Sequence, residues 1–112
     1  SSDTVIKEVL VHIENIGLKT LVPLGLLLNE LISNSFKHAF ANDTLDLIKI
    51  DISPVSTNEF KFSYCDNGQW KEKDGSETKF GSELINILTE QLDGNFRREK
   101  SEYTFNLKNL DI

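Results

Sequence analysis

Four polar residues of one predicted helix offer the chemistry of a metal and phosphate site. At about 100° per residue they fall on one stripe at the edge of the core-facing surface: Glu30, Asn34, Lys37 and His38. They supply a carboxylate, an amide, an ammonium and an imidazole, groups that ligate a metal ion and offset phosphate charge. The alternative is a solvated helix face with a Glu30–Lys37 charge pair two turns apart, and frequency alone favours that alternative.

A second polar group lies at the end of a predicted strand. Asp66 has the same parity as Phe60, Phe62 and Tyr64, so its side chain is expected to face the helices. A carboxylate buried there needs hydrogen-bond donors, and the exocyclic amine of a bound base would supply them. Gly68 would let the ring of such a ligand approach the backbone closely. The alternative is a plain Asp-Asn-Gly turn.

A third signal is Gly81, which the sequence places at the opening of a helix. A glycine there exposes free backbone N–H groups at the positive end of the helix dipole, which favours an anion. Taken alone this signal is weak, because Ser82 can serve simply as an N-cap.

The elements that position these groups follow from the period of the apolar residues. The predictions are a strand Val9–Ile13, an extended piece Leu18–Leu21, a helix Pro23–Ala39, strands Leu45–Ser53 and Glu59–Asp66, a helix Ser82–Leu92 and a hairpin of Asn95–Arg98 and Tyr103–Leu107. Pro23 suits a first helical position, and Gly94 is expected to close the second helix in the left-handed conformation. This pattern predicts a two-layer α/β sandwich.

The core face of the first helix is predicted from the same wheel. It comprises Leu24, Leu28, Leu31, Ile32, Ala39 and the small Ser35. These side chains are expected to pack on the sheet.

Composition limits the classes of function. The 112 residues suit one domain, and 18 acidic against 12 basic residues leave a net charge of -6, which argues against nucleic acid as a partner. The longest apolar run, Leu24–Leu28, is far short of the roughly 20 residues that span a bilayer. A single cysteine, Cys65, excludes an internal disulfide and every multi-cysteine zinc site, so we expect a cytoplasmic setting.

Taken in order, these segments resemble the ATP-binding catalytic domain of two-component sensor histidine kinases. The run Pro23–Phe40 looks like the N box of that family, with an N-E-L-x-x-N-x-x-K-H-A-F core. Asp66-Asn67-Gly68 is similar to the G1 box, and Gly81–Gly94 looks like the G2 box with the helix behind the ATP lid. The resemblance covers roughly residues 5 to 110 and implies the Bergerat fold, a mixed, mostly antiparallel sheet covered on one face by helices.

The resemblance implies Mg²⁺ and ATP as cofactors and gives each polar residue of the first helix a role. Asn34 would ligate the metal, and Glu30 would lie beside it and orient the attacking group or a water. Lys37 and His38 would neutralise phosphate charge.

The glycine boxes would complete the nucleotide site. Asp66 would accept the adenine amine, Gly68 would make room for the ring, and Gly81 would bring the helix N-terminus to the phosphates. Trp70 stands where the family has a second glycine, and the lid, Lys71–Lys79, is short. The glycine-threonine pair that the family has before the last strand is also missing. These departures bear on catalytic rate more than on ATP binding.

The implied activity is that of a histidine protein kinase, which donates the γ-phosphoryl group to a histidine on a separate dimerisation domain. The helical hairpin that carries this phosphoacceptor is not found in the sequence, so we expect a single domain, residues 1–112, cut from a longer protein. The partners would be that phosphoacceptor domain and a response regulator, and membrane attachment of the parent protein is left open. The alternatives are an ATPase of the same fold, in which Glu30 activates water, and a degenerate docking module without kinase activity.

Overall fold

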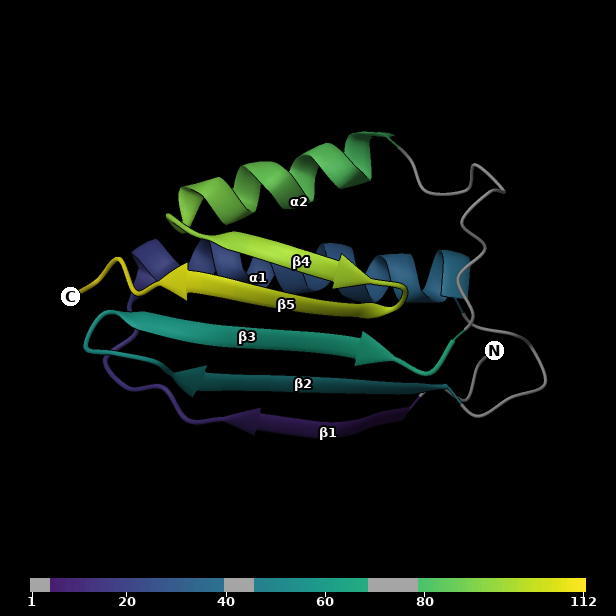
Figure 1. Cartoon of the computed structure of the whole chain (residues 1–112), viewed down its shortest axis with the longest axis horizontal. Coiled ribbons are helices and arrows are strands. Elements are labelled where there is room, and N and C mark those ends of the chain that lie inside the picture. The colour runs from purple at the N-terminus through teal and green to yellow at the C-terminus, as the bar shows by residue number, and fades with distance from the viewer. Residues whose placement is uncertain (1–4, 40–45, 69–78) are drawn as a thin grey trace.

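The structure is a computed structural model that describes residues 5–39, 46–68 and 79–112. In this part of the chain a five-stranded sheet forms one layer, and two α-helices with a short π-helix form the other (Figure 1). The elements are β1 (Val5–Val11), α1 (Leu18–Asn34), the π-helix η1 (Ser35–Ala39), β2 (Leu47–Pro54), β3 (Glu59–Asp66), α2 (Lys79–Gln91), β4 (Asn95–Glu99) and β5 (Glu102–Lys108). The predicted α+β two-layer sandwich is confirmed.

The sheet is mixed, as predicted. Its strand order is β1-β2-β3-β5-β4, with β1 parallel to β2 and the other neighbours antiparallel. Parallel neighbours need a crossover connection, and α1 provides it between β1 and β2. The two α-helices pack against each other on the same face of the sheet (Figure 1).

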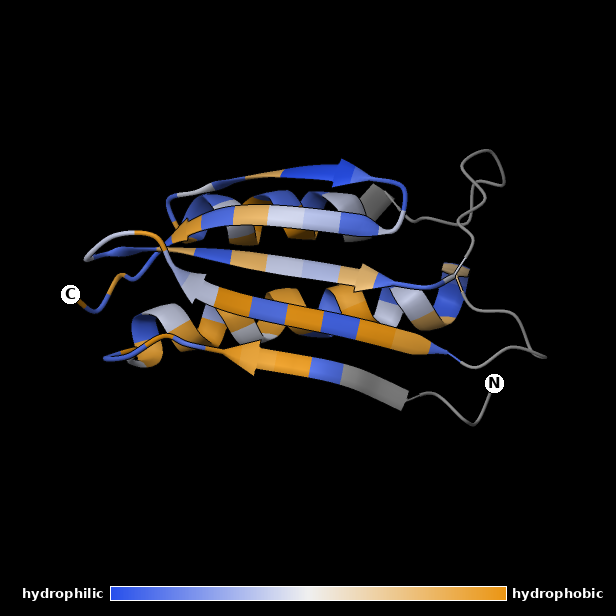
Figure 2. Cartoon of the chain, turned by 60° about the horizontal axis from the view of Figure 1, so that its bottom comes forward, coloured by the Kyte–Doolittle hydropathy of each residue, from blue (hydrophilic) through white to orange (hydrophobic). Residues whose placement is uncertain are grey.

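The core lies between the helices and the inner face of the sheet. Every second residue of the central strands is buried there, and Figure 2 shows the resulting alternation of hydrophobic and hydrophilic residues along β2. Aromatic rings fill the middle of the core, where Phe62 and Phe105 stack with their centroids 5.2 Å apart and Phe96 and Phe105 with theirs 5.1 Å apart.

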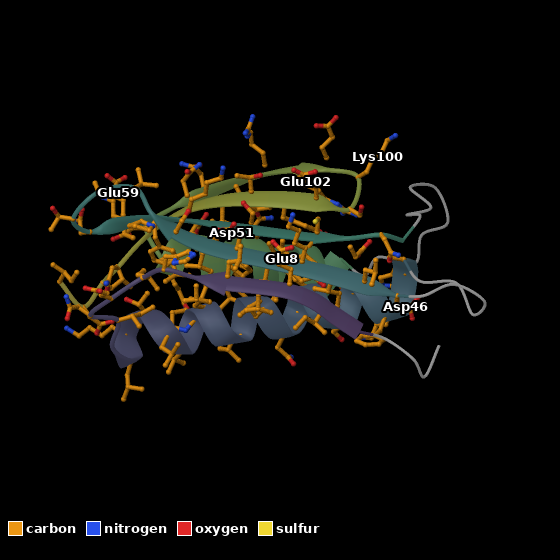
Figure 3. All side chains as sticks on the ribbon, turned by 90° about the horizontal axis from the view of Figure 1, so that it is seen from below. Glu8, Asp46, Asp51, Glu59, Lys100 and Glu102 are labelled. Carbon is orange, nitrogen blue, oxygen red and sulfur yellow. The ribbon has the colours of Figure 1, made fainter. Side chains whose placement is uncertain are left out.

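The other face of the sheet is polar. Asp51 and Glu102 stand on the side away from the helices (Figure 3), and Lys49 Nζ lies 3.8 Å from a carboxylate oxygen of Glu8. Because the polar groups on this face meet solvent, any site that depends on burial has to lie on the helix side.

The start of α1 differs from the prediction. Leu18–Leu21 is the first turn of the helix and not an extended piece, so Pro23 lies inside α1 instead of at its first position. The cause is remote in sequence: one carboxylate oxygen of Asp111 accepts hydrogen bonds from the N–H groups of Gly17 at 2.8 Å and Thr20 at 3.1 Å. These bonds satisfy N–H groups that a helix start leaves without partners.

The core face and the end of α1 also differ from the helical-wheel prediction. Leu27, which the prediction omits, is fully buried, whereas Leu28 and Ile32 are half-buried at the margin of the core. The remaining predicted core positions are buried: Leu24, Leu31, Ser35 and Ala39. The predicted single helix to Ala39 is partly wrong, because its last five residues form η1. The wider turn of a π-helix shifts every later side chain on the wheel.

The strands follow the prediction more closely. The strand predicted at Val9–Ile13 is β1, which begins and ends earlier, at Val5 and Val11. The predicted Leu45–Ser53 corresponds to β2, and Leu45 lies outside the described residues. The predicted bounds of β3 are confirmed, and the predicted final hairpin is β4 and β5.

The second helix begins earlier than predicted, at Lys79 instead of Ser82. The left-handed residue after it is Asp93, with φ 49°, and not Gly94. Gly94 is needed for another reason, because a Cβ there would collide with the carbonyl oxygen of Asn106 on β5. In the described ranges no helix has both the length and the apolar character needed to cross a membrane.

Candidate functional site

Three of the predicted motifs meet at one end of the molecule. The end of β3, η1 and the first turn of α2 all lie at the side of the fold opposite to the start of α1 (Figure 1). This arrangement follows from topology, because α1 and β3 run in the same direction in that view and α2 returns from the same end.

Asp66 ends β3 with its carboxylate turned toward the helices, as its parity predicts, and only 8% of the residue is exposed. Both carboxylate oxygens have donors within the chain. The Ser35 hydroxyl donates to Oδ2 at 2.6 Å, and the Gly68 N–H donates to Oδ1 at 2.9 Å. Each oxygen of an ionised carboxylate has two lone-pair sites, so one acceptor site on each is left over.

Tyr64, two residues before Asp66, extends this group of hydrogen bonds. Its hydroxyl lies 2.6 Å from the Ser35 hydroxyl and 3.2 Å from the carbonyl oxygen of Leu31 on α1. Burial raises the pKa of the Tyr64 hydroxyl well above its ordinary value; the hydrogen bond with Ser35 opposes this and the charge of Asp66 adds to it. The Tyr64 hydroxyl donates to the Leu31 carbonyl oxygen, and in the short contact with Ser35 either hydroxyl can be the donor.

Gly68 lies against the end of η1. A Cβ at position 68 would come within 2.5 Å of the Ala39 carbonyl carbon and 2.6 Å of the Ala39 Cβ. The glycine is therefore required by the close approach of two backbone segments, the exit from β3 and the end of η1. Whether Gly68 also makes room for the ring of a ligand is not tested by this contact and stays a prediction.

The polar stripe of the first helix runs from the interior to solvent. Asn34 is buried, with 4% of the residue exposed, and its amide nitrogen has no hydrogen-bond partner among the residues that the structure describes. Glu30 and His38 are half-buried and Lys37 is exposed. Buried polar groups rarely go without partners, so the unpartnered N–H group of Asn34 makes this residue a candidate for contact with a bound group, whereas a metal ion would need the amide oxygen instead.

The donor set bears on which metal fits here. Within residues 5–39, 46–68 and 79–112, no three or more His, Cys, Asp or Glu side chains gather where they would hold a metal ion. A zinc or calcium cage is therefore not formed by this part of the chain. A single amide oxygen beside a half-buried carboxylate suits Mg²⁺, which keeps several waters and takes few protein ligands.

Gly81 lies in the first turn of α2 and not before it, because the helix begins at Lys79. The N–H groups of a first turn have no partners within the helix, so this turn keeps the anion-binding character that the sequence predicts. Trp70 and the predicted lid up to residue 78 lie outside the described residues.

Comparison with known proteins identifies the fold. No family model and no curated protein matches the sequence. The blue-light activated histidine kinase EL346 of Erythrobacter litoralis superposes on 96% of this chain with a TM-score of 0.79 and 17% identity. This chain has the fold of a histidine kinase domain.

Two further structures agree with this histidine kinase fold. The isolated histidine kinase domain of EL346 gives a TM-score of 0.71 at 20% identity, and the mycobacterial sensor histidine kinase MprB gives 0.67 at 12% identity, each over 96% of this chain. The chain spans 36% of the full EL346 structure, 55% of its isolated domain and 84% of the MprB structure. The predicted resemblance is thus confirmed at the level of the fold.

Two residues that the sequence analysis did not assign to the site belong to it. Ser35 was predicted as a small core residue and Tyr64 as part of an apolar strand face, yet both share hydrogen bonds with the Asp66 group. The parity that puts Tyr64 on the same face as Asp66 was a usable signal, and so was the one hydroxyl on an otherwise apolar helix face.

Proposed function

We propose that this chain is the Mg-ATP-binding catalytic domain of a sensor histidine kinase. Its role would be to donate the γ-phosphoryl group of ATP to a histidine on a separate dimerisation domain. The observation that carries the proposal is the buried carboxylate of Asp66 beside the helix that bears the buried Asn34 amide, within a histidine kinase fold. A site for a nucleoside triphosphate requires a group that recognises the base and a group that binds the metal ion, on neighbouring elements.

At the base end, Asp66 accepts the exocyclic amine of adenine. The acceptor sites that Ser35 and Gly68 leave free are available for that amine. A carboxylate that is an acceptor only favours an amine over the carbonyl that guanine carries at the same ring position. Gly68 borders the ring where β3 meets η1.

At the phosphate end, Asn34 holds the metal through its amide oxygen, and Glu30 orients the group that attacks the γ-phosphorus. When bound, Mg²⁺ would offset the charge of the phosphate oxygens, and Asn34 would be the residue that holds it. Lys37 and His38 add positive charge along the same stripe. The first turn of α2, with Gly81, directs its free N–H groups at the phosphates. The chain contributes positioning and electrostatics to the transfer.

The partners that this activity requires are a phosphoacceptor domain of the same protein and a response regulator. We place the reaction in the cytoplasm, where ATP is available. Burial raises the pKa of the half-buried Cys65 thiol, and the charge of Glu102 adds to this, so a smaller fraction of it is thiolate.

Turnover of γ-labelled ATP by the full-length protein tests the proposal against its two alternatives. We expect label on a histidine of the phosphoacceptor domain. Release of free phosphate with no labelled histidine identifies an ATPase in which Glu30 activates water. Neither product from a folded protein identifies a docking module, and titration of the fragment with Mg-ADP separates a module that binds nucleotide from one that does not.

A further inference from the structure

A chain of hydrogen bonds joins the helix layer to the base end of the site. It runs from the Tyr64 hydroxyl to the Ser35 hydroxyl and on to Oδ2 of Asp66, with both contacts at 2.6 Å. We propose that Ser35, held by Tyr64, is a positioning residue that sets the preference for adenine through Asp66. This inference rests on the proposed function and deepens it.

The first step of the argument is how firmly the carboxylate of Asp66 is held. Ser35 is completely buried at the junction of α1 and η1, next to Asn34 in the chain. Its bond to Oδ2 and the Gly68 N–H bond to Oδ1 act on opposite oxygens. A carboxylate bound at both oxygens cannot rotate, so its remaining acceptor sites keep one direction.

The second step concerns the proton of Ser35. A serine hydroxyl rotates freely and donates to whichever acceptor is best placed. Tyr64 limits that freedom: its buried hydroxyl, which donates to the Leu31 carbonyl oxygen, lies 2.6 Å from the Ser35 oxygen and holds it in place, while the Ser35 hydroxyl donates to Asp66. The proton of Ser35 then points at Asp66 and is not available to a ligand.

The third step is what this means for the base. Adenine presents an amine at ring position 6, and hypoxanthine and guanine present a carbonyl there. With its donor committed to Asp66, Ser35 offers nothing to that carbonyl, and Asp66 offers only acceptors. The carbonyl bases therefore face unpaired lone pairs at a buried site, which is a costly mismatch.

A purely structural role for Ser35 predicts a different result. If Ser35 only holds α1 against β3, its loss would lower the affinity for all nucleotides to a similar degree. Loss of positioning would instead narrow the gap between adenine and hypoxanthine nucleotides. The ratio of the two affinities therefore separates the two roles, whereas the affinity for ADP alone does not.

The experiment titrates this fragment with Mg-ADP and Mg-IDP, which differ in the group at ring position 6 and in the proton that hypoxanthine carries on the neighbouring N1. We expect the parent to prefer ADP, Ser35→Ala to lower the ADP/IDP affinity ratio by about tenfold, and Tyr64→Phe to lower it by about threefold. Ser35→Thr keeps the hydroxyl and should restore most of the ratio. The control is Ser63→Ala, which removes a hydroxyl from the outward side of β3 and should leave the ratio unchanged.

Circular dichroism shows which variants are folded, and Tyr64→Phe decides the matter if Ser35→Ala does not fold. An unchanged ratio in the folded variants at positions 35 and 64 overturns the inference while the proposed function stands. If the parent binds neither nucleotide, the proposed function fails, and the inference fails with it.

Discussion

Replacement of Gly68 by alanine tests the contact between the exit from β3 and the end of η1. The added Cβ would lie 2.5 Å from the carbonyl carbon of Ala39 and 2.6 Å from its Cβ. Non-bonded carbon atoms settle about 3.5–4.0 Å apart, so one of the segments has to move by roughly 1 Å. The obstructing atoms are the backbone carbonyl oxygen and carbon of Ala39 and its Cβ, and none of them can be moved by a side-chain rotation.

We expect Gly68→Ala to lower the free energy of unfolding by about 1–3 kcal/mol, the usual cost of overpacking. The same displacement pulls the Gly68 N–H away from Oδ1 of Asp66, which it meets at 2.9 Å in the parent. Affinity for Mg-ADP should therefore fall by about tenfold, the value of one hydrogen bond to a charged group.

Urea unfolding followed by circular dichroism measures the first effect and nucleotide titration the second. The matched control is Gly25→Ala on the exposed side of α1, where a new Cβ has no heavy atom within 4 Å. That change should raise the free energy of unfolding by about 0.5–1 kcal/mol, because alanine favours a helix interior over glycine. The reasoning is refuted if Gly68→Ala is as stable as the parent, or gains stability as Gly25→Ala does.

The remaining predictions concern the metal side, the base side and the start of α1. Asn34→Ala should abolish Mg²⁺-dependent nucleotide binding without loss of the fold; titrations with and without Mg²⁺ check this, and equal affinities for parent and variant would exclude the assignment. Asp66→Asn keeps an acceptor and loses the charge, so the preference for ATP over GTP should weaken by about 1–3 kcal/mol; a parent that binds both equally well contradicts Asp66 as a base reader. Desolvation raises the pKa of Asp111, but hydrogen bonds from Thr20 and Gly17 outweigh it and hold this pKa below its ordinary value of 3.8. These bonds therefore stabilise the folded state at pH values above 3.8, and their contribution is lost as the pH falls through the lowered pKa. Asp111→Asn should flatten the stability profile between about pH 2 and 5, as measured by thermal unfolding, and an unaltered profile would count against the carboxylate as the cap.

The sheet and the orientation of Asp66 were predictable because both depend on local alternation. Side chains of a strand alternate between faces, so the burial of Phe60, Phe62 and Tyr64 fixed the direction of Asp66. The apolar period likewise identified most of the core of α1. Both features depend only on residues that lie close together in the sequence.

Other features depend on contacts between distant segments and could not be predicted. The first turn of α1 depends on Asp111, which follows Gly17 by 94 residues, and no local pattern joins them. The sequence predicted the correct face for both Ser35 and Tyr64. Their hydrogen bond, however, depends on the position of α1 along the sheet, which no local pattern determines. The wheel put Asn34 at the rim, and the structure buries it.

The capping of α1 by Asp111 also constrains the order of folding. Asn109 and Leu110, also far along the chain, help to complete the start of this helix: Thr20 donates to Asn109 Oδ1 and accepts from the Leu110 N–H at 2.7 Å. During synthesis the helix that carries Asn34 emerges early, yet its first turn gains these partners only after residue 111 has left the ribosome. Contacts of such high sequence separation form slowly, because a long loop has to close first. A nascent chain that stalls before residue 109 would therefore hold α1 with a frayed first turn, exposed to proteases and chaperones.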